Sequence, residues 1–401
     1  MKSKILITCP KGIPPVLKQE LTDLSCPILG ETIAGVETEG DMNDAMRLNL
    51  RLRTAHRVLL VLAEFPARDP DALYRKVRNI PWETIVSADG YLCITSAVDM
   101  PGIRDSRYAS LKCKDAIVDR IKEKKGRRPD SGPERDRSVV HLYWADNKAT
   151  VYLDTSGEPL SRRGYRKIPL AAPMQETLAA AVVLATRWNG EGHFINPMCG
   201  SGTLAIEAAL IALRRAPGLL RTNFGFLHAP THDEAAWKKI RDEARREGLK
   251  ELAGRIIAAD IDPAAVDAAK KNAATAGVDH LIEFGVCDFS ETTVPSGPGV
   301  VVMNPEYGER MGEVQKLEAV YTGIGDFLKQ KCAGYRGYVF TGNLELAKKI
   351  GLRSKRRIPF WNSGIECRLL EYELYEGSRQ GDKVTRRQGD EDGPSDTVNT
   401  Y

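Results

Sequence analysis

The stretch NPMCGSGTLAIEAALIA, residues 196–212, decides the fold that the sequence predicts. The short apolar run just before it is typical of a strand, and its alanine- and leucine-rich second half is typical of a helix. Gly200 and Gly202 stand in the turn between them, where glycine lets the backbone pass close to a ligand beside unpaired helix N–H groups. The turn matches neither the dinucleotide nor the triphosphate fingerprint, so a tight strand-to-helix turn explains it equally well when taken alone.

Around this turn, short β-rich segments alternate with helical segments from Ala172 onward. The segments predicted as strands are HFIN (193–196), RIIAA (255–259), IEFGV (282–286), GVVVM (299–303) and GYVFT (337–341). A helix is expected over 172–188, and further helices are expected between most of the strands. Such alternation favours a mostly parallel sheet covered on both faces, so we predict an α/β, Rossmann-like domain.

Acidic residues follow two of these strands at the edge where open α/β sheets bind ligands. Asp260 ends the second strand, and its carboxylate could accept hydrogen bonds from both hydroxyls of a ribose. Asp288 follows the third strand and could accept a hydrogen bond from an adenine amino group. Asp262 needs no ligand, because it can cap a helix that has Pro263 at its first position.

The four strands in chain order therefore end in a glycine turn, an acid, a second acid and the turn NPEY at 304–307. This order resembles the class I S-adenosylmethionine-dependent methyltransferases, and NPEY resembles the Asn-Pro-Pro-Tyr signature of enzymes that methylate exocyclic amino groups. The resemblance implies S-adenosylmethionine as cofactor. It also implies that Asn304 and Pro305 accept the N–H groups of a base amine through their oxygens, and that Tyr307 stacks on the everted base.

The likeness narrows to one family over about residues 3–376. LDTSGEPLSRRGYR (153–166), APMQETLAAAVV (172–183) and FTGNLELAKKIGLRSKRRIPFWNSGIECRLL (340–370) occur in order around the glycine turn and NPEYGER. Together they resemble the THUMP-domain RNA methyltransferases that are similar to the guanine-N2 methyltransferases of 23S rRNA. Relatives of that family carry the older label of N6-adenine-specific DNA methylases. The family's catalytic domain has a seven-stranded mixed sheet, preceded by an α+β ferredoxin-like and THUMP module that binds RNA.

The resemblance implies four regions along the chain. Residues 1–52 correspond to the ferredoxin-like region, 53–160 to the THUMP domain and 161–376 to the class I methyltransferase domain. The last region, 377–401, has almost no apolar side chains, so it cannot bury enough surface to order itself and is predicted to be a disordered tail.

Carried over by position, the family's two sites fall on residues near the strand ends. The implied methyl-donor site comprises Asn196, Met198, Cys199, Gly200, Gly202, Thr203, Asp260, Ile261 and Asp288. The implied catalytic, target-base site comprises Asn304, Pro305 and Tyr307. Two departures stand out, because family members often have aspartate where this chain has Asn196 and proline where it has Glu306. Three alternatives follow for Glu306. If its carboxylate points away from the target base, the enzyme works like other members of the family, and if it points toward the base, it favours guanine over adenine. The third alternative is an enzyme of weakened activity.

The net charge of +4 is distributed unevenly, with basic clusters in 104–137, 160–167 and 353–357. One such cluster is usually a solvated face, but three favour a polyanionic partner, because neutralising phosphates releases counterions. RNA, 23S rRNA or a ribosomal precursor, is the partner that the family resemblance implies. The candidate RNA contacts, each with simple surface solubility as its alternative, are Lys11, Lys112, Lys114, Arg162, Arg163, Arg166 and Arg310.

Other classes of protein are disfavoured by the composition. There is no run of 18 or more apolar residues, which a membrane-spanning helix needs, and the six histidines show no metal-ligand spacing. The eight cysteines are scattered, as expected for reduced thiols in a cytoplasmic protein. We therefore predict an rRNA guanine-N2 methyltransferase that uses no metal. Two alternatives stay open: adenine N6 methylation of DNA or RNA, and a non-catalytic RNA-binding or ribosome assembly protein.

Overall fold

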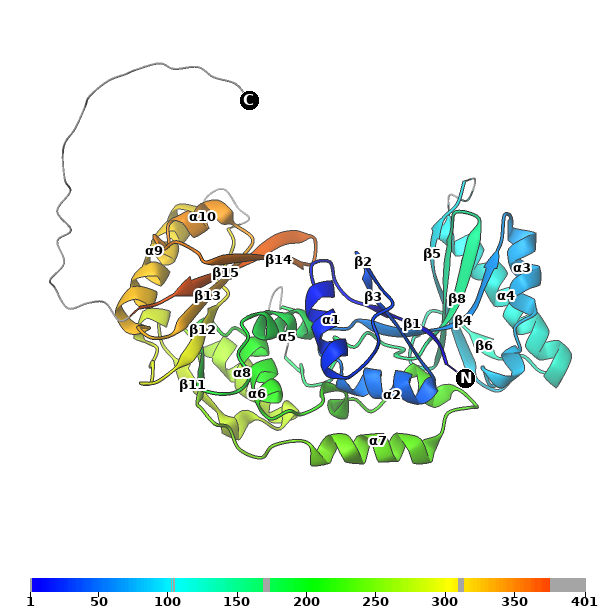
Figure 1. The fold of residues 1–401 in the computed structure, drawn as a ribbon, viewed down its shortest axis with the longest axis horizontal. Helices are drawn as coiled ribbons and strands as arrows, with labels where there is room; N and C mark the ends of the chain where they lie inside the picture. Colours follow the sequence, from blue (N-terminus) through cyan, green and yellow to red (C-terminus); the bar gives the residue numbers. More distant parts are fainter. Residues whose placement is uncertain (1, 102, 104, 169–173, 309–313, 376–401) are drawn as a thin grey trace, which may run out of the picture.

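The structure is a computed structural model that describes residues 2–101, 103, 105–168, 174–308 and 314–375 (Figure 1). Two β-sheets, each with its own helices, make up most of these residues. No helix among them is both long and apolar enough to cross a membrane. The predicted tail, 377–401, lies outside the described residues.

The first sheet contains eight strands in the order β2-β3-β1-β4-β8-β7-β5-β6. Its strands are β1 Ser3–Thr8, β2 Gly30–Thr32, β3 Gly35–Gly40, β4 Arg57–Pro66, β5 Tyr91–Asp99, β6 Asp130–Ser131, β7 Ser138–Ala145 and β8 Lys148–Asp154. The helices in this part of the chain are α1 Pro14–Asp23, α2 Met42–Arg51, α3 Pro70–Arg78 and α4 Ser106–Lys125.

Strand β4 belongs to both halves of this sheet. Its first residues pair with β1, from Arg57 to Leu60, and its residues from Leu59 to Pro66 pair with β8. The register with β8 shifts between Val61 and Ala63, which is where the strand passes from one half to the other. The N-terminal part is therefore one continuous sheet.

The half of the sheet beyond β8 has its own core. Trp82 and Trp144 are fully buried there, and α3 and α4 pack together over the sheet. Strands β7 and β8 form a hairpin, and its turn uses Asp146 and Asn147, both with positive φ (50° and 58°). Asp and Asn tolerate this left-handed backbone better than other non-glycine residues, and such a turn matches the twist of a hairpin.

The second sheet contains seven strands in the order β11-β10-β9-β12-β13-β15-β14, with only β15 running against its two neighbours. Its strands are β9 His193–Asn196, β10 Ile256–Asp260, β11 Ile282–Val286, β12 Gly299–Met303, β13 Arg336–Thr341, β14 Arg356–Asn362 and β15 Ile365–Glu373. Its helices are α5 Glu176–Ala185, α6 Thr203–Ala212, α7 Glu234–Arg246, α8 Pro263–Ala276, α9 Val314–Lys331 and α10 Leu344–Lys348. The predicted seven-stranded mixed sheet is confirmed.

Alternation along the central strand β12 shows how helices cover both faces. Val300 and Val302 join the core cluster that contains α5, α6 and α8, whereas Val301 and Met303 join the cluster under α9. All four side chains are fully buried, because successive residues of a strand point to opposite faces and both faces are covered here. This explains the unbroken apolar run in the sequence.

The two sheets are joined by a shared apolar core and by a contact between helices of the two parts. Residues of β1 and α1 belong to the same apolar cluster as residues of α5 and α6. The segment between α6 and β10 adds a second connection, because α7 packs on α2 and Arg51 on α2 bonds the Glu247 carboxylate at 2.8 Å. Figure 1 shows α7 lying along α2. The N-terminal module and the seven-stranded domain are therefore tied together at several points.

Candidate functional site

The four polar strand ends are neighbours at one edge of the second sheet. Strands β11, β10, β9 and β12 are adjacent in that order and parallel, so their carboxyl ends meet at one edge. The structure thereby places Asp288, Asp260, Asn196 and Asn304 at consecutive positions along that edge. The strand order reverses between β9 and β12, and doubly wound sheets bind ligands at such a switch point.

The glycine turn is shaped by two left-handed residues. Gly200 has φ +52° and Gly202 has φ +82°. A Cβ at Gly202 would lie 2.8 Å from the Cβ of Ala269 on α8, so glycine there allows α8 to pack close to the start of α6. A Cβ at Gly200 would meet nothing within 4 Å. The backbone at Gly200 therefore borders open space that a ligand can occupy.

Asp260 fastens this turn to the neighbouring strand. Its Oδ2 accepts a hydrogen bond from the Gly200 N–H at 2.8 Å, and its Oδ1 accepts one from the Asp262 N–H at 3.1 Å. Each carboxylate oxygen has a further lone pair, and the side chain is only half-buried, so it can accept more hydrogen bonds. Asp262 caps α8 as predicted, accepting from the Ala264 N–H at 2.9 Å.

The other predicted donor-site residues differ in what they offer. Asn196 is fully buried, and its Nδ2 donates to the Val302 carbonyl at 2.9 Å, but its Oδ1 has no partner in the described parts of the chain. Burial raises the pKa of the Cys199 thiol, so this cysteine stays protonated and is no nucleophile. Thr203 is buried at the start of α6, and Met198 is half-buried beside the sheet.

Two exposed aliphatic side chains flank Asp260. Ile261 is 68% exposed and Val286, the cross-strand partner of Asp260, is 55% exposed. Large apolar side chains with this exposure at a ligand-binding edge offer surface for a flat ring. Val286 was not among the predicted site residues, although a β-branched residue two positions before Asp288 was the available signal.

Asp288 has a structural role in addition to the predicted one. Its Oδ1 accepts from the Ser290 N–H at 2.9 Å and the Ser290 hydroxyl at 2.6 Å, which starts the short 3-10 turn Phe289–Glu291. The side chain is half-buried. A carboxylate that caps a turn with one oxygen can still present the other to a ligand.

The NPEY turn is held by bonds that the sequence did not reveal. The Tyr307 hydroxyl donates to Asn304 Oδ1 at 2.9 Å, so one lone pair of the predicted acceptor for a base amine is engaged within the protein and the other remains for a ligand. Tyr321 donates to the Glu306 carbonyl at 3.1 Å, and Asn343 donates to the Tyr307 carbonyl at 2.9 Å. Burial raises the pKa of Tyr307, which keeps its hydroxyl a donor.

The side chains of Pro305 and Glu306 point to different surroundings. Pro305 is buried, whereas the Glu306 side chain is exposed. Exposure to solvent is what the alternative of a carboxylate pointing away from the target base expects, and the direction of the carboxylate relative to that base stays a prediction. Asn343 was not among the predicted site residues. It could have been predicted, because it is a polar residue just after a strand, as the predicted site residues are.

The prediction that Arg163 contacts RNA is wrong. Its side chain is 1% exposed, and its guanidinium bonds the Leu160 carbonyl at 2.9 Å, the Arg53 carbonyl and Glu207. Arg166 is also engaged within the protein, because it donates to Thr203 Oγ1 at 3.2 Å and lies 3.4 Å from the Glu176 carboxylate. Arg163 is an internal cation that links Arg53 of the N-terminal module to Glu207 on α6.

The other predicted RNA contacts lie on the surface or outside the described residues. The Arg162 side chain is 74% exposed and pairs with Glu158. Lys112 and Lys114 on α4 are about one-third exposed, at 31% and 32%, and pair with Asp71 and Asp115. Arg310 belongs to 309–313, which lies outside the described residues. The surface residues stay candidates for RNA contact.

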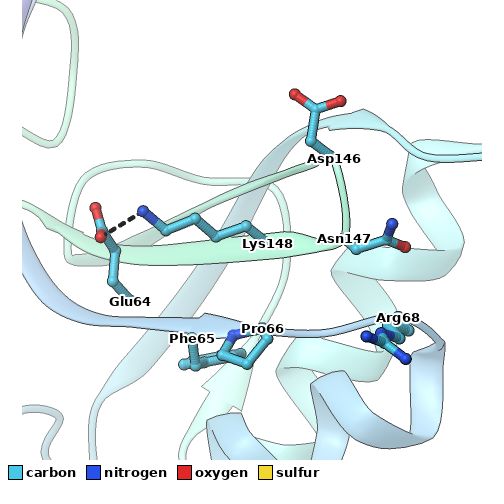
Figure 2. Close-up of a pocket in the computed structure, with 7 residues that line it drawn as sticks. All are labelled: Glu64, Phe65, Pro66, Arg68, Asp146, Asn147 and Lys148. Carbon is cyan, nitrogen blue, oxygen red and sulfur yellow. Dashed lines mark ion pairs between the residues drawn. The ribbon is translucent and has the colours of Figure 1, made fainter.

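A separate hollow lies in the N-terminal sheet (Figure 2), far along the molecule from the second sheet. Its volume is about 410 Å³, and it is lined by Glu64, Phe65, Pro66, Arg68, Asp146, Asn147 and Lys148. Lys148 pairs with Glu64 at 2.6 Å and lowers the pKa of that carboxyl. This hollow shares no residue with the strand-end site. Within the described ranges no cluster of three or more His, Cys, Asp or Glu side chains could hold a metal ion.

Comparison with known families identifies the second sheet and its helices. The family described as "RMKL-like, methyltransferase domain" matches residues 163–371, which is more than half of the chain. The chain belongs to this family. Two further families match the N-terminal part, the RlmL ferredoxin-like domain over residues 4–59 and the THUMP domain over residues 67–154. The family resemblance and fold class stated from the sequence are confirmed.

Relatives of this RMKL-like chain include two proteins named ribosomal RNA large subunit methyltransferase K/L. The protein from Syntrophotalea carbinolica is 41% identical over 384 residues, covering 93% of this chain and 54% of the relative. The protein from Pseudomonas aeruginosa is 37% identical over 377 residues, covering 92% of this chain and 52% of the relative. The chain thus spans about half the length of the curated relatives that it matches.

Two solved structures share the RMKL-like fold over nearly their whole length. SMU.472, solved in complex with SAH, superposes with a TM-score of 0.85 at 27% identity, covering 94% of this chain and 99% of that one. A protein from Listeria monocytogenes, described as a predicted N6-adenine-specific DNA methylase, gives a TM-score of 0.84 at 29% identity, covering 93% and 97%. Both sheets and their arrangement are therefore common to the three proteins.

Proposed function

We propose that this chain is an S-adenosylmethionine-dependent RNA methyltransferase acting on the N2 amine of a guanine in 23S rRNA. The observation that carries the proposal is the adjacency of the strand ends: the glycine turn and Asp260 lie beside the strand that leads to Asn304. The names of the K/L relatives support rRNA as the substrate class. Such a substrate places the proposed activity in the cytoplasm.

The strand-end residues fit S-adenosylmethionine. Gly200 borders open space, Asp260 has free acceptor capacity for ribose hydroxyls, and Ile261 with Val286 offers apolar surface for an adenine ring. A buried amide oxygen without a partner is costly, so Asn196 Oδ1 is a natural acceptor for a donor brought by a ligand. When bound, the cofactor supplies an electrophilic methyl group on a sulfonium.

The target-base residues act by orientation. A base amine is a weak nucleophile, because its lone pair is delocalised into the ring. Asn304 Oδ1 and the Pro305 carbonyl would each accept one N–H and aim the amine toward the donor side of the edge, and fixed geometry of this kind lowers the barrier. The Tyr307 ring would stack on the base. The exposure of Glu306 favours a site in which Asn304 and Pro305 orient the amine. It disfavours a site in which the Glu306 carboxylate also accepts hydrogen bonds from the guanine edge.

The four regions 1–52, 53–160, 161–376 and 377–401 are kept as the proposed division of the chain. In this division the first two regions bind RNA through surface cations such as Lys112 and Lys114, and Arg162 at the start of the third region is a further candidate contact. The third region, 161–376, catalyses methyl transfer. The THUMP match at residues 67–154 supports an RNA rather than a DNA substrate.

Adenine N6 methylation is the second candidate, because the NPxY turn and the name of the Listeria relative both favour it. The test is transfer of a labelled methyl group to in vitro transcribed 23S rRNA, followed by mass spectrometry of the nucleosides. N2-methylguanosine is expected, and N6-methyladenosine would establish the second candidate. Calorimetry with S-adenosylmethionine tests the non-catalytic alternative, since a protein without a donor site gives no binding heat.

We expect Asp260→Ala to weaken binding of S-adenosylmethionine by about 1–3 kcal/mol, because both the ribose acceptor and the Gly200 tether are lost. Calorimetry measures this change. Asp262→Ala is the matched control two residues away: losing its cap should cost about 1 kcal/mol of stability while donor affinity stays within twofold. Equal donor affinity in wild type and Asp260→Ala would contradict the assignment.

We expect Tyr307→Phe to keep RNA methylation within about fivefold of wild type, because Asn304 Oδ1 loses only an internal hydrogen bond worth about 1 kcal/mol and keeps its lone pairs for the base amine. The ring stays, so kcat should change little. Tyr307→Ala removes the ring and should lose most activity. If Tyr307→Phe is as impaired as Tyr307→Ala, the hydroxyl itself acts on the RNA and this interpretation is wrong.

A further inference from the structure

The β14–β15 hairpin forms one wall beside the target-base residues. A Cβ at Gly342 would lie 2.8 Å from Ile365 at the hairpin tip and 2.9 Å from the Tyr307 ring, so these two side chains meet there. Phe340 connects the same residues, with its ring centre 6.4 Å from Tyr307 and 6.0 Å from Phe360 on β14. The hairpin tip therefore lies at the sheet edge where NPEY ends β12.

Trp361 stands next to Phe360 on β14 but on the opposite face, because side chains alternate along a strand. A loop of the N-terminal module covers it. Gly12, just before α1, has φ +86°, and a Cβ there would lie 2.8 Å from the Trp361 ring and 2.9 Å from the Pro359 carbonyl. Figure 1 shows the start of α1 beside β14. The loop can approach this closely only with glycine.

Lys11, the residue before Gly12, is fixed over the tryptophan. Its Nζ lies 4.4 Å from the centre of the Trp361 ring, a cation–π contact, and the residue is exposed. Within the described part of the chain no carboxylate pairs with Lys11, whereas the nearby Lys18 on α1 lies 3.6 Å from Glu31. The rim of the β14–β15 hairpin, on the face opposite Phe360, thus carries an exposed ammonium group that no carboxylate of the described chain neutralises.

We propose that Lys11 binds a backbone phosphate of the nucleotide adjacent to the everted base, and that Trp361 is the positioning residue that holds Lys11 at this rim. The inference deepens the proposed function and rests on it. An RNA strand whose base enters beside Tyr307 passes over the hairpin wall, and its phosphate is the complementary partner for an unpaired ammonium group. The tryptophan contact restricts the lysine before RNA arrives, which reduces the ordering cost of binding.

The test measures binding of in vitro transcribed 23S rRNA over a series of salt concentrations. Each phosphate contact adds about 0.7–0.9 to the slope of log affinity against log salt. Lys11→Ala should therefore weaken binding and reduce the slope by about that amount, whereas Lys11→Arg should keep it. Lys18→Ala is the matched control, because that lysine lies in the same region but is already paired, and it should match wild type.

The positioning role has its own readout in a double-mutant cycle. Trp361→Leu should weaken RNA binding less than Lys11→Ala, and the double variant should bind like Lys11→Ala alone, because tryptophan acts only through the lysine. Additive effects would overturn that role. An unchanged salt slope in Lys11→Ala would overturn the phosphate contact.

Failure of this inference is distinct from failure of the proposed function. Calorimetry with S-adenosylmethionine should give wild-type heat for every variant at this rim, since the donor site is elsewhere on the edge. A wild-type protein that gives no such heat and methylates no RNA overturns the proposed function. An active wild type with an unchanged Lys11→Ala slope overturns only the inference about Lys11.

Discussion

Asn304→Ala should lower kcat for RNA methylation by about 100-fold or more, with donor binding and RNA affinity nearly unchanged. The methyl side chain offers no acceptor, so the amine would be held by the Pro305 carbonyl alone, and small losses of alignment cost about 100-fold in rate. The Tyr307 hydroxyl also loses its partner, which adds disorder at the turn. Single-turnover transfer to 23S rRNA measures the effect.

Asn304→Asp is the control for this prediction, because a carboxylate keeps an acceptor oxygen in the same place. It should retain far more activity than Asn304→Ala. A variant Asn304→Ala with more than about one-tenth of wild-type kcat would mean that amine orientation contributes little, since orientation by a single group usually accounts for larger factors.

The second large effect is on the free energy of unfolding, and it should differ sharply between substitutions of two adjacent arginines. Arg163→Ala should destabilise the protein by about 3–5 kcal/mol, because it leaves the Glu207 carboxylate uncompensated in a fully buried place. Arg162→Ala should change stability by about 0.5 kcal/mol or less, since that exposed side chain pairs with Glu158 on the surface. Denaturant unfolding of the two variants gives both values.

The same pair separates a structural arginine from an RNA contact. Arg163→Ala at a temperature where it is fully folded should bind 23S rRNA as wild type does. Wild-type stability combined with lost RNA affinity would restore the discarded prediction that Arg163 reads phosphate. Tyr165 gives an independent check, since its hydroxyl donates to the same Glu207 carboxylate at 3.0 Å and its removal should also destabilise the protein.

Local pattern was sufficient to locate the parallel strands and the polar residues that end them. HFIN, IEFGV and GVVVM were predicted with the bounds that the structure has, because short β-rich runs between helices leave little choice. The four strand ends were expected at one edge because parallel strands share one. The site residues themselves are placed together by the structure, and their roles stay predictions.

The sequence pattern could not predict which residues form hydrogen bonds or ion pairs with residues far away along the chain. Nothing in SRRGYR distinguishes Arg162 from Arg163, because the difference lies in Glu207, which is 44 residues away along the chain. The bond between Tyr307 and Asn304 likewise depends on how a turn folds. The helix expected over 172–188 is described only from Glu176 to Ala185, and Arg187 with φ +58° marks its end.

The shared strand β4 limits how the protein can be dissected. A fragment that begins after Pro66 would lack the neighbour of β8, and a fragment that stops before Arg57 would leave β1 without its partner on that side. Either truncation exposes a row of unsatisfied backbone groups, which is a template for aggregation. The two N-terminal regions should therefore melt in a single transition, and neither should be recoverable as a stable piece unless it carries Arg57–Pro66 with it.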